Sequence, residues 1–188
     1  MIERIELKNA SIKYWIEELP FLPEYPYEVD TSFFNVGNEE TDCKTIKFAI
    51  ELYLHKNSGN YGLLGFEYTP NEGGCLELII HYVKENSVQY ESQLTQYNDY
   101  KYCGLPEENI KIIKDTFAKF LSQKEGFSGG MFKINVSANC EVGSSPLLYS
   151  IILEMLLKID FRYDTIFDFA FWKSQHFAIY LEELGIKL

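Results

Sequence analysis

The chain has 188 residues, of which 46% are hydrophobic and 16% aromatic, and its formal net charge is −11. This composition is typical of a globular protein, and the chain is long enough to bury a core without metals or disulfides. The excess of carboxylates disfavours nucleic acid and anionic membranes as partners, because contacts with phosphate require cations. We therefore expect no nucleic-acid partner and no membrane association.

The start of the chain and its cysteines favour a cytoplasmic protein. Met1 is followed by charged residues instead of the apolar core of a signal peptide, and no run approaches the roughly 20 apolar residues of a membrane span. The four cysteines are scattered without a CxxC pair, which favours reduced thiols, although their even number also permits two disulfides. They are Cys43, Cys75, Cys103 and Cys140.

The clearest secondary-structure signal lies between residues 44 and 86. In TIKFAIELYLHK (45–56) every second residue from Ile46 to Leu54 is apolar, while Lys47, Glu51 and His55 fall on the other face, which is typical of a half-buried strand. The turn sequences NSGN and PNEGG are each followed by another extended apolar run. The pattern predicts three strands in an antiparallel meander. Residues 1–19 fit either a strand and a helix or two strands.

The second half of the chain predicts a loop, a helix, a strand and a second helix. Residues 87–104 are polar and tyrosine-rich, and a helix with Pro106 in its first turn follows over 105–124. The sequence MFKINVSANCEV (131–142) predicts a strand, and 146–159 predict a deeply buried helix. The strand is expected to direct Phe132, Ile134, Val136, Ala138 and Cys140 to one face. In the C-terminal part, FDFAF alternates like a strand, whereas 177–184 have helical spacing.

The element order β-β-β-α-β-α indicates an α+β fold. We expect a single domain over residues 1–188, with a mainly antiparallel sheet and helices packed on one of its faces. The sequence leaves the oligomeric state open.

A glycine-serine turn precedes the second helix and suggests one possible site. Gly143, Ser144 and Ser145 follow a predicted strand, and the N–H groups of a helix's first turn can bind an anion. EVGSSP is similar to the Gly-Leu-Gly-Ser-Ser-Ala core of the galactokinase, homoserine kinase and mevalonate kinase family. This resemblance covers about six residues and implies a loop that wraps nucleotide phosphates.

The same turn also reads as the start of a helix, and we favour this interpretation. Pro146 replaces the alanine of that family and lacks an N–H group, Glu141 is adjacent, and no lysine or arginine is close in sequence. Ser144 or Ser145 would cap the helix and Pro146 would be its first residue. A nucleotide- or phosphate-binding enzyme domain using Gly143, Ser144 and Ser145 is therefore the alternative function.

Other catalytic and metal-binding patterns are missing from the sequence. His55, His81 and His176 form no HExxH motif or Cys/His cluster, so we expect no metal and no cofactor. A nucleophilic pair of Cys140 and His81 would require their strands to align, and an inward cysteine is more often a small apolar residue. We assign no catalytic residue and expect a binding protein rather than an enzyme.

Residues 17–43 form an acidic and aromatic segment that we expect to be extended and to bind a partner. The segment has eight carboxylates, no lysine or arginine, and prolines at 20, 23 and 26. Aromatic anchors surrounded by negative charge suit the capture of a basic protein, as in an inhibitor or immunity-type protein that neutralises a cationic toxin or nuclease. The candidate partner-binding residues are Glu24, Tyr25, Tyr27, Glu28, Asp30, Phe33, Phe34, Glu39 and Glu40. The competing interpretation is a solvated loop whose rings pin it to the core.

Overall fold

The computed structural model describes residues 1–7, 9–37, 44–55, 60–86, 88–94, 100–123, 128–141 and 143–158. Its strands are β1 (Ile2–Leu7), β2 (Ala10–Ile16), β3 (Glu28–Asn35), β4 (Ile46–Leu54), β5 (Asn60–Pro70), β6 (Cys75–Tyr82), β7 (Lys101–Cys103) and β8 (Gly130–Cys140). Its helices are α1 (Ile110–Gln123) and α2 (Pro146–Leu157), and a 3-10 turn, η1 (Glu107–Asn109), leads into α1.

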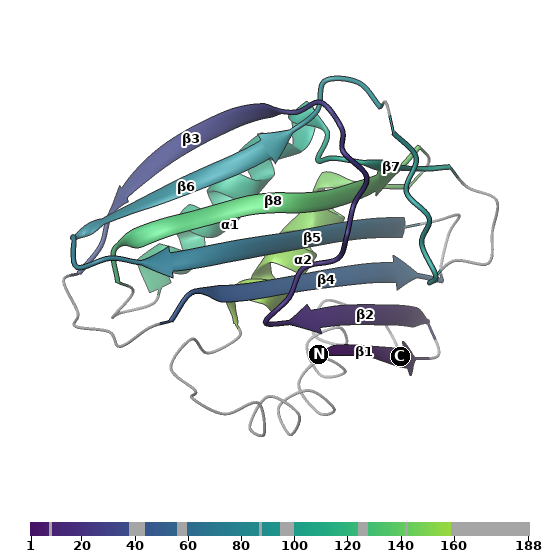
Figure 1. Cartoon of the computed structure of the whole chain (residues 1–188), viewed down its shortest axis with the longest axis horizontal. Coiled ribbons are helices and arrows are strands. Elements are labelled where there is room, and N and C mark those ends of the chain that lie inside the picture. Colours follow the sequence, from purple (N-terminus) through teal and green to yellow (C-terminus); the bar gives the residue numbers. More distant parts are fainter. Residues whose placement is uncertain are drawn as a thin grey trace.

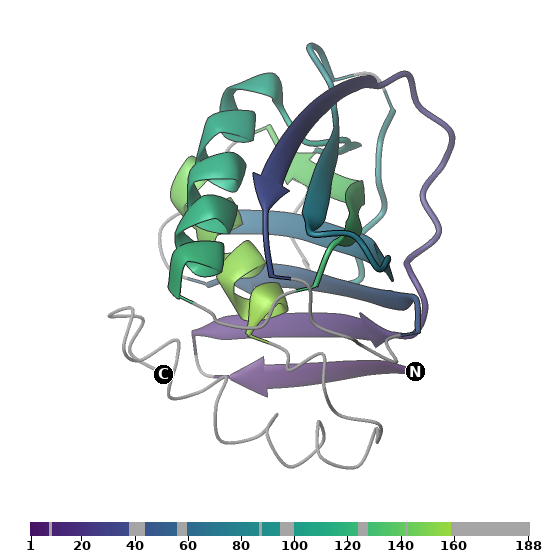
Figure 2. The same cartoon turned by 90° about the vertical axis from the view of Figure 1, so that its left-hand side faces the viewer.

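The strands form one sheet in the order β1-β2-β4-β5-β8-β6-β3, with β7 paired to the end of β8. All neighbours are antiparallel except β6 and β8, which run parallel because the chain crosses over between them through α1. Figures 1 and 2 show both helices on the same face of the sheet. The expected α+β fold with helices on one face is therefore confirmed.

Several predicted elements are also confirmed. Residues 1–19 form two strands rather than a strand and a helix. Pro106, which the sequence placed at the first helical position, is instead the N-cap of η1, one residue before the helical turn begins. The alternating apolar residues of β4 face the helices and pack with α1 and α2 into the main core. The predictions for 160–188 lie outside the described residues, as do Cys43, Glu39 and Glu40.

The predicted meander is wrong in its second pairing, because β8 inserts between β5 and β6. The turn at 71–74 therefore spans the start of β8 instead of closing a tight hairpin, and Asn71 N–H donates to the Gly129 carbonyl at 3.0 Å. The backbones approach so closely that a Cβ on Gly129 would lie 1.5 Å from the Gly73 carbonyl oxygen. Glycine at 129 thus permits the insertion.

The expectation that β8 directs its apolar residues to one face is also wrong. The register between β5 and β8 shifts at Gly65 and Phe66, where Asn135 is the extra residue of a β-bulge. Phe132 and Ile134 consequently pack in the main core, whereas Val136, Ala138 and Cys140 belong to a cluster on the opposite face. The bulge therefore gives the face without helices its own apolar centre.

Candidate functional site

A segment without regular structure, residues 17–27, runs from the end of β2 to the start of β3 (Figures 1 and 2). It crosses the face of the sheet that lies opposite the helices. We call this segment the strap and this side of the sheet the strap face. Glu17 begins the strap with a φ of 62°, and its N–H donates to the Lys47 carbonyl at 2.9 Å. Residues 17–27 form neither a helix nor a strand, and residues 28–35 of the predicted segment form β3.

Leucine side chains hold the strap against the sheet. Leu19 and Leu22 pack on the apolar cluster of the strap face. Tyr25 is half-buried, and burial raises the pKa of its hydroxyl. The cluster under the strap and the neighbouring loop 88–94 consists of Trp15, Ala49, Tyr53, Tyr61, Leu63, Leu94, Val136, Ala138 and Cys140. One half of the strap face is thereby covered.

Three carboxylates of the strap and of β3 are paired with cations of the same chain. Glu18 contacts the N-terminal amine at 2.8 Å, Glu28 contacts Lys84 at 2.7 Å, and Asp30 contacts Lys114 of α1 at 2.5 Å. Hydrogen bonds from Lys84 and the Tyr82 hydroxyl lower the pKa of Glu28. Glu28 and Asp30 therefore position β3 and leave less charge for a partner than the sequence suggested.

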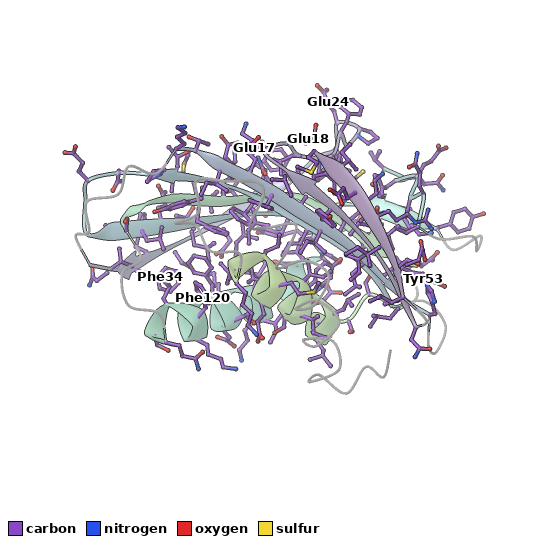
Figure 3. All side chains as sticks on the ribbon, turned by 90° about the horizontal axis from the view of Figure 1, so that it is seen from below. Glu17, Glu18, Glu24, Phe34, Tyr53 and Phe120 are labelled. Carbon is purple, nitrogen blue, oxygen red and sulfur yellow. The ribbon has the colours of Figure 1, made fainter. Side chains whose placement is uncertain are left out.

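Glu17 and Glu24 have no ion pair within the described part of the chain, and both point away from the helices (Figure 3). Phe21, in the strap, is 90% exposed. Tyr27 is 51% exposed, and its ring stacks on His81 with centroids 4.0 Å apart. The strap thus presents rings and unpaired carboxylates on the same side of the molecule.

β3 divides the remaining candidate residues between the two faces of the sheet. Phe34 points toward the helices (Figure 3), and its ring centroid lies 5.5 Å from that of Phe117 in α1. Phe33, which precedes Phe34 in the sequence, is 67% exposed on the strap face. Phe34 is therefore a core residue, and Phe33 is the available ring.

The part of the strap face formed by β3 and β6 is open. Val29 and Phe33 are exposed on β3, and Glu77 lies directly opposite Phe33 on β6. Glu77 has no ion pair with any described residue. Val29 and Glu77 do not stand out in the sequence, because the pairing of β3 with β6 is not visible there. Alternation within TSFFN separates Phe33 from Phe34 but does not say which ring faces inward.

Glu51 is fully buried beneath the covered half of the strap face, although the sequence predicted it on the outer side of its strand. Its Oε1 accepts a hydrogen bond from the Tyr61 hydroxyl at 2.7 Å, and no described residue forms a hydrogen bond with its Oε2. Burial raises the pKa of Glu51 despite the opposing effects of the Ser92 hydroxyl, the Tyr61 hydroxyl and the charges of Lys13 and Lys101. A half-satisfied buried carboxyl destabilises the layer that covers it.

The glycine-serine turn before α2 uses its hydroxyls within the fold. Ser145 is the N-cap, and its Oγ accepts from Leu148 N–H at 3.3 Å. Ser144 Oγ accepts from Cys140 N–H at 2.7 Å and donates to the Tyr61 carbonyl at 2.5 Å. Pro146 is the first residue of α2. The predicted capping role is confirmed, with Gly143 at a φ of 108° turning the chain.

A cavity of about 180 Å³ adjoins Ser144 at the ends of β6 and β8. Its charged lining consists of Lys84, Glu85, Glu108 and Glu141. Lys84 is engaged by Glu28, so the balance of charge around the cavity is negative. This environment disfavours a phosphate group.

Catalytic and metal-binding geometry finds no support among the described residues. The register of β6 and β8 pairs Ile80, the neighbour of His81, with Ile134, and Cys140 lies six residues further, about 20 Å along the strand. Burial and the charge of Lys133 lower the pKa of His81 to about 4. In the described ranges, no three His, Cys, Asp or Glu residues come together to hold a metal ion.

Cys75, Cys103 and Cys140 are free thiols. Among the described helices, neither combines the length and apolar character needed to cross a membrane.

Comparison with protein-family models, with curated proteins and with solved structures finds no match to this chain.

Proposed function

We propose that this protein is a binding module that captures a basic protein partner on its strap face. The observation that carries the proposal is the exposure of Phe33 beside the unpaired Glu77, on the open part of a sheet. Contiguous exposed apolar surface, such as that of Val29 and Phe33 on β3, is typical of partner-binding sites, and rings at the centre of an interface supply much of its affinity. Glu17, Glu24 and Glu77 add the negative charge that attracts and orients a cationic partner.

An inhibitor or immunity-type protein is the form of this function that we favour, with a cationic nuclease or toxin as its partner. We place it in the cytoplasm, because free thiols such as Cys75, Cys103 and Cys140 are typical of reducing compartments. The nucleotide- or phosphate-binding alternative has less support. Both serine hydroxyls of its turn already bond to backbone groups, and carboxylates surround the adjacent cavity.

Affinity capture from the source cell tests this function when the captured proteins are eluted with graded salt. The immobilised wild-type chain should retain a basic protein that elutes as the ionic strength rises. A Phe21→Ser/Phe33→Ser double variant should lose that protein, because it lacks both exposed rings. A matched Phe21→Leu/Phe33→Leu variant keeps the apolar surface and should retain most of it. Equal retention by the serine and wild-type chains, or an acidic captured protein, would count against the proposal.

A further inference from the structure

β3 is the last strand of the sheet and pairs only with β6 among the described residues. Val36 N–H donates to the Gly74 carbonyl at 2.9 Å, in register with the β3–β6 pairing. In an antiparallel ladder, hydrogen-bonded and non-hydrogen-bonded pairs alternate. The even-numbered residues of β3 therefore bond to β6, whereas the N–H and C=O groups of Val29, Thr31 and Phe33 point outward from the edge.

This edge lacks several of the usual protections against pairing with another chain. Natural edge strands are blunted by proline, by charged side chains, above all lysine, by a bulge or by a covering segment. The two charged residues of β3, Glu28 and Asp30, are carboxylates paired with Lys84 and Lys114, and they disfavour an acidic strand more than a basic one. β3 (EVDTSFFN) contains no proline or lysine, and its register with β6 is continuous over eight residues. Among the residues that the structure describes, no strand or helix lies along its outer edge.

The inner side of β3 is firmly fixed. Asp30 is paired with Lys114 of α1, and Phe34 packs on Phe117 of the same helix. Glu28 is held by Lys84 at the other end of the strand. An edge that is already ordered loses little conformational entropy when a further strand joins it.

Carboxylates lie near both ends of the open edge. Glu24 precedes β3 by four residues, Glu85 follows Lys84, which pairs with Glu28 at the start of β3, and Glu72 lies in the turn next to the end of β3. Glu77 lies opposite Phe33 on β6. None of the four has an ion pair with a described residue. A strand that carries lysine or arginine therefore fits this edge better than a neutral or acidic one.

We infer that the basic partner binds through an extended segment that adds a strand to β3. The inference rests on the proposed function and specifies its mode. Main-chain bonds to Val29, Thr31 and Phe33 supply affinity, and alternate side chains of the added strand lie over the exposed rings of the strap face. Basic side chains reach Glu77 and the carboxylates at either end of the strand.

A displayed library of random peptides of about 12 residues tests this mode, because such a length exceeds that of one strand. The full chain is the bait, and each enriched peptide is then measured by fluorescence polarisation. Thr31→Pro removes one outward N–H group without removing a bond to β6, and edge strands tolerate proline at such positions. Thr31→Val keeps the N–H group and is the matched control.

The inference predicts peptides rich in lysine and arginine that bind Thr31→Pro about tenfold or more weakly than wild type. Thr31→Val should bind within about twofold of wild type. Hydrogen exchange on the wild-type chain gives a readout that does not depend on the folding of Thr31→Pro. The amides of Val29, Thr31 and Phe33 should exchange more slowly when the peptide is bound.

The outcomes separate the mode from the function. Basic peptides that bind Thr31→Pro as well as wild type, with no added protection of these amides, would overturn strand addition and leave the proposed function intact. Enriched peptides without basic residues, or no enrichment at all, would overturn both. A dimer of the chain that protects the same three amides would assign the edge to a second copy and contradict the inference.

Discussion

Phe33 on β3 and Glu77 on β6 face each other in a pair that exchanges no backbone hydrogen bonds, so their side chains emerge close together on the strap face. One is an exposed ring, and the other is a carboxylate without an ion pair among the described residues. A guanidinium group can stack on such a ring and pair with such a carboxylate at once. This pair of residues is where we expect an arginine of the partner to bind.

Glu51→Gln should stabilise the protein at neutral pH. Burial raises the folded-state pKa of Glu51 above its ordinary value of 4.5, so the folded chain binds a proton at this group more tightly than the unfolded chain does. The contribution of this group to stability is therefore greatest below the ordinary pKa and falls as pH rises through the raised one. Glutamine cannot ionise and so removes this pH-dependent loss of stability. Urea melts should show that the free energy of unfolding is about 1–3 kcal/mol higher for Glu51→Gln at pH 7.

The stability difference between Glu51→Gln and wild type should shrink as the pH is lowered toward 4.5. Glu72→Gln, at an exposed turn, is the matched control and should change stability by less than about 0.5 kcal/mol. A difference that stays constant with pH would show that Glu51 is ionised throughout, held by Lys13 and Lys101.

Tyr61→Phe should destabilise the wild-type chain by about 1–3 kcal/mol, because it removes the hydrogen bond to Oε1 of Glu51. The same change in the Glu51→Gln background should be less harmful, since an amide is easier to bury than a carboxyl with a tendency to ionise. A double-mutant cycle in urea measures the coupling. Additive effects would contradict an energetic link between the two residues.

Gly129→Ala should destabilise the fold by about 3 kcal/mol, because its Cβ would collide with the Gly73 backbone. Gly37→Ala, where an added Cβ meets nothing within 4 Å, should be close to neutral. Thermal melts of the two variants provide the comparison. Similar melting temperatures would mean that β8 does not pass the 71–74 turn as closely as described.

Ser145→Ala should lower the free energy of unfolding by about 1 kcal/mol, the usual effect of losing an N-cap.

Wild type should give no thermal shift with ATP or GTP, with or without magnesium, because the turn's hydroxyls are occupied and its surroundings are acidic. A magnesium-dependent shift that Ser145→Ala abolishes would revive the phosphate-binding alternative.

The periodic signals in the sequence predicted much of the fold. Alternation located β4, β5 and β6, helical spacing located α1 and α2, and the Ser-Pro sequence located the N-cap of α2. These features depend on interactions within a few residues along the chain. They remain visible in a single sequence for that reason.

The errors arose where distant segments meet. Strand order depends on the close approach at Gly129, and the bulge at Asn135 shifts the register against β5. Glu51 looked solvated because alternation cannot reveal that a distant loop, with Ser92, lies over its side chain. For the candidate site, composition picked out the strap and Phe33, but ion pairs with Lys84 and Lys114 were not visible in sequence.

The most direct test of partner capture is the association rate of the purified basic partner at several ionic strengths, with wild type and with Glu24→Lys/Glu77→Lys. The account predicts that wild-type association slows steeply as salt increases, and that the variant associates about tenfold more slowly at low salt with a flatter dependence. Matched rates and matched salt dependence for the two proteins would contradict it.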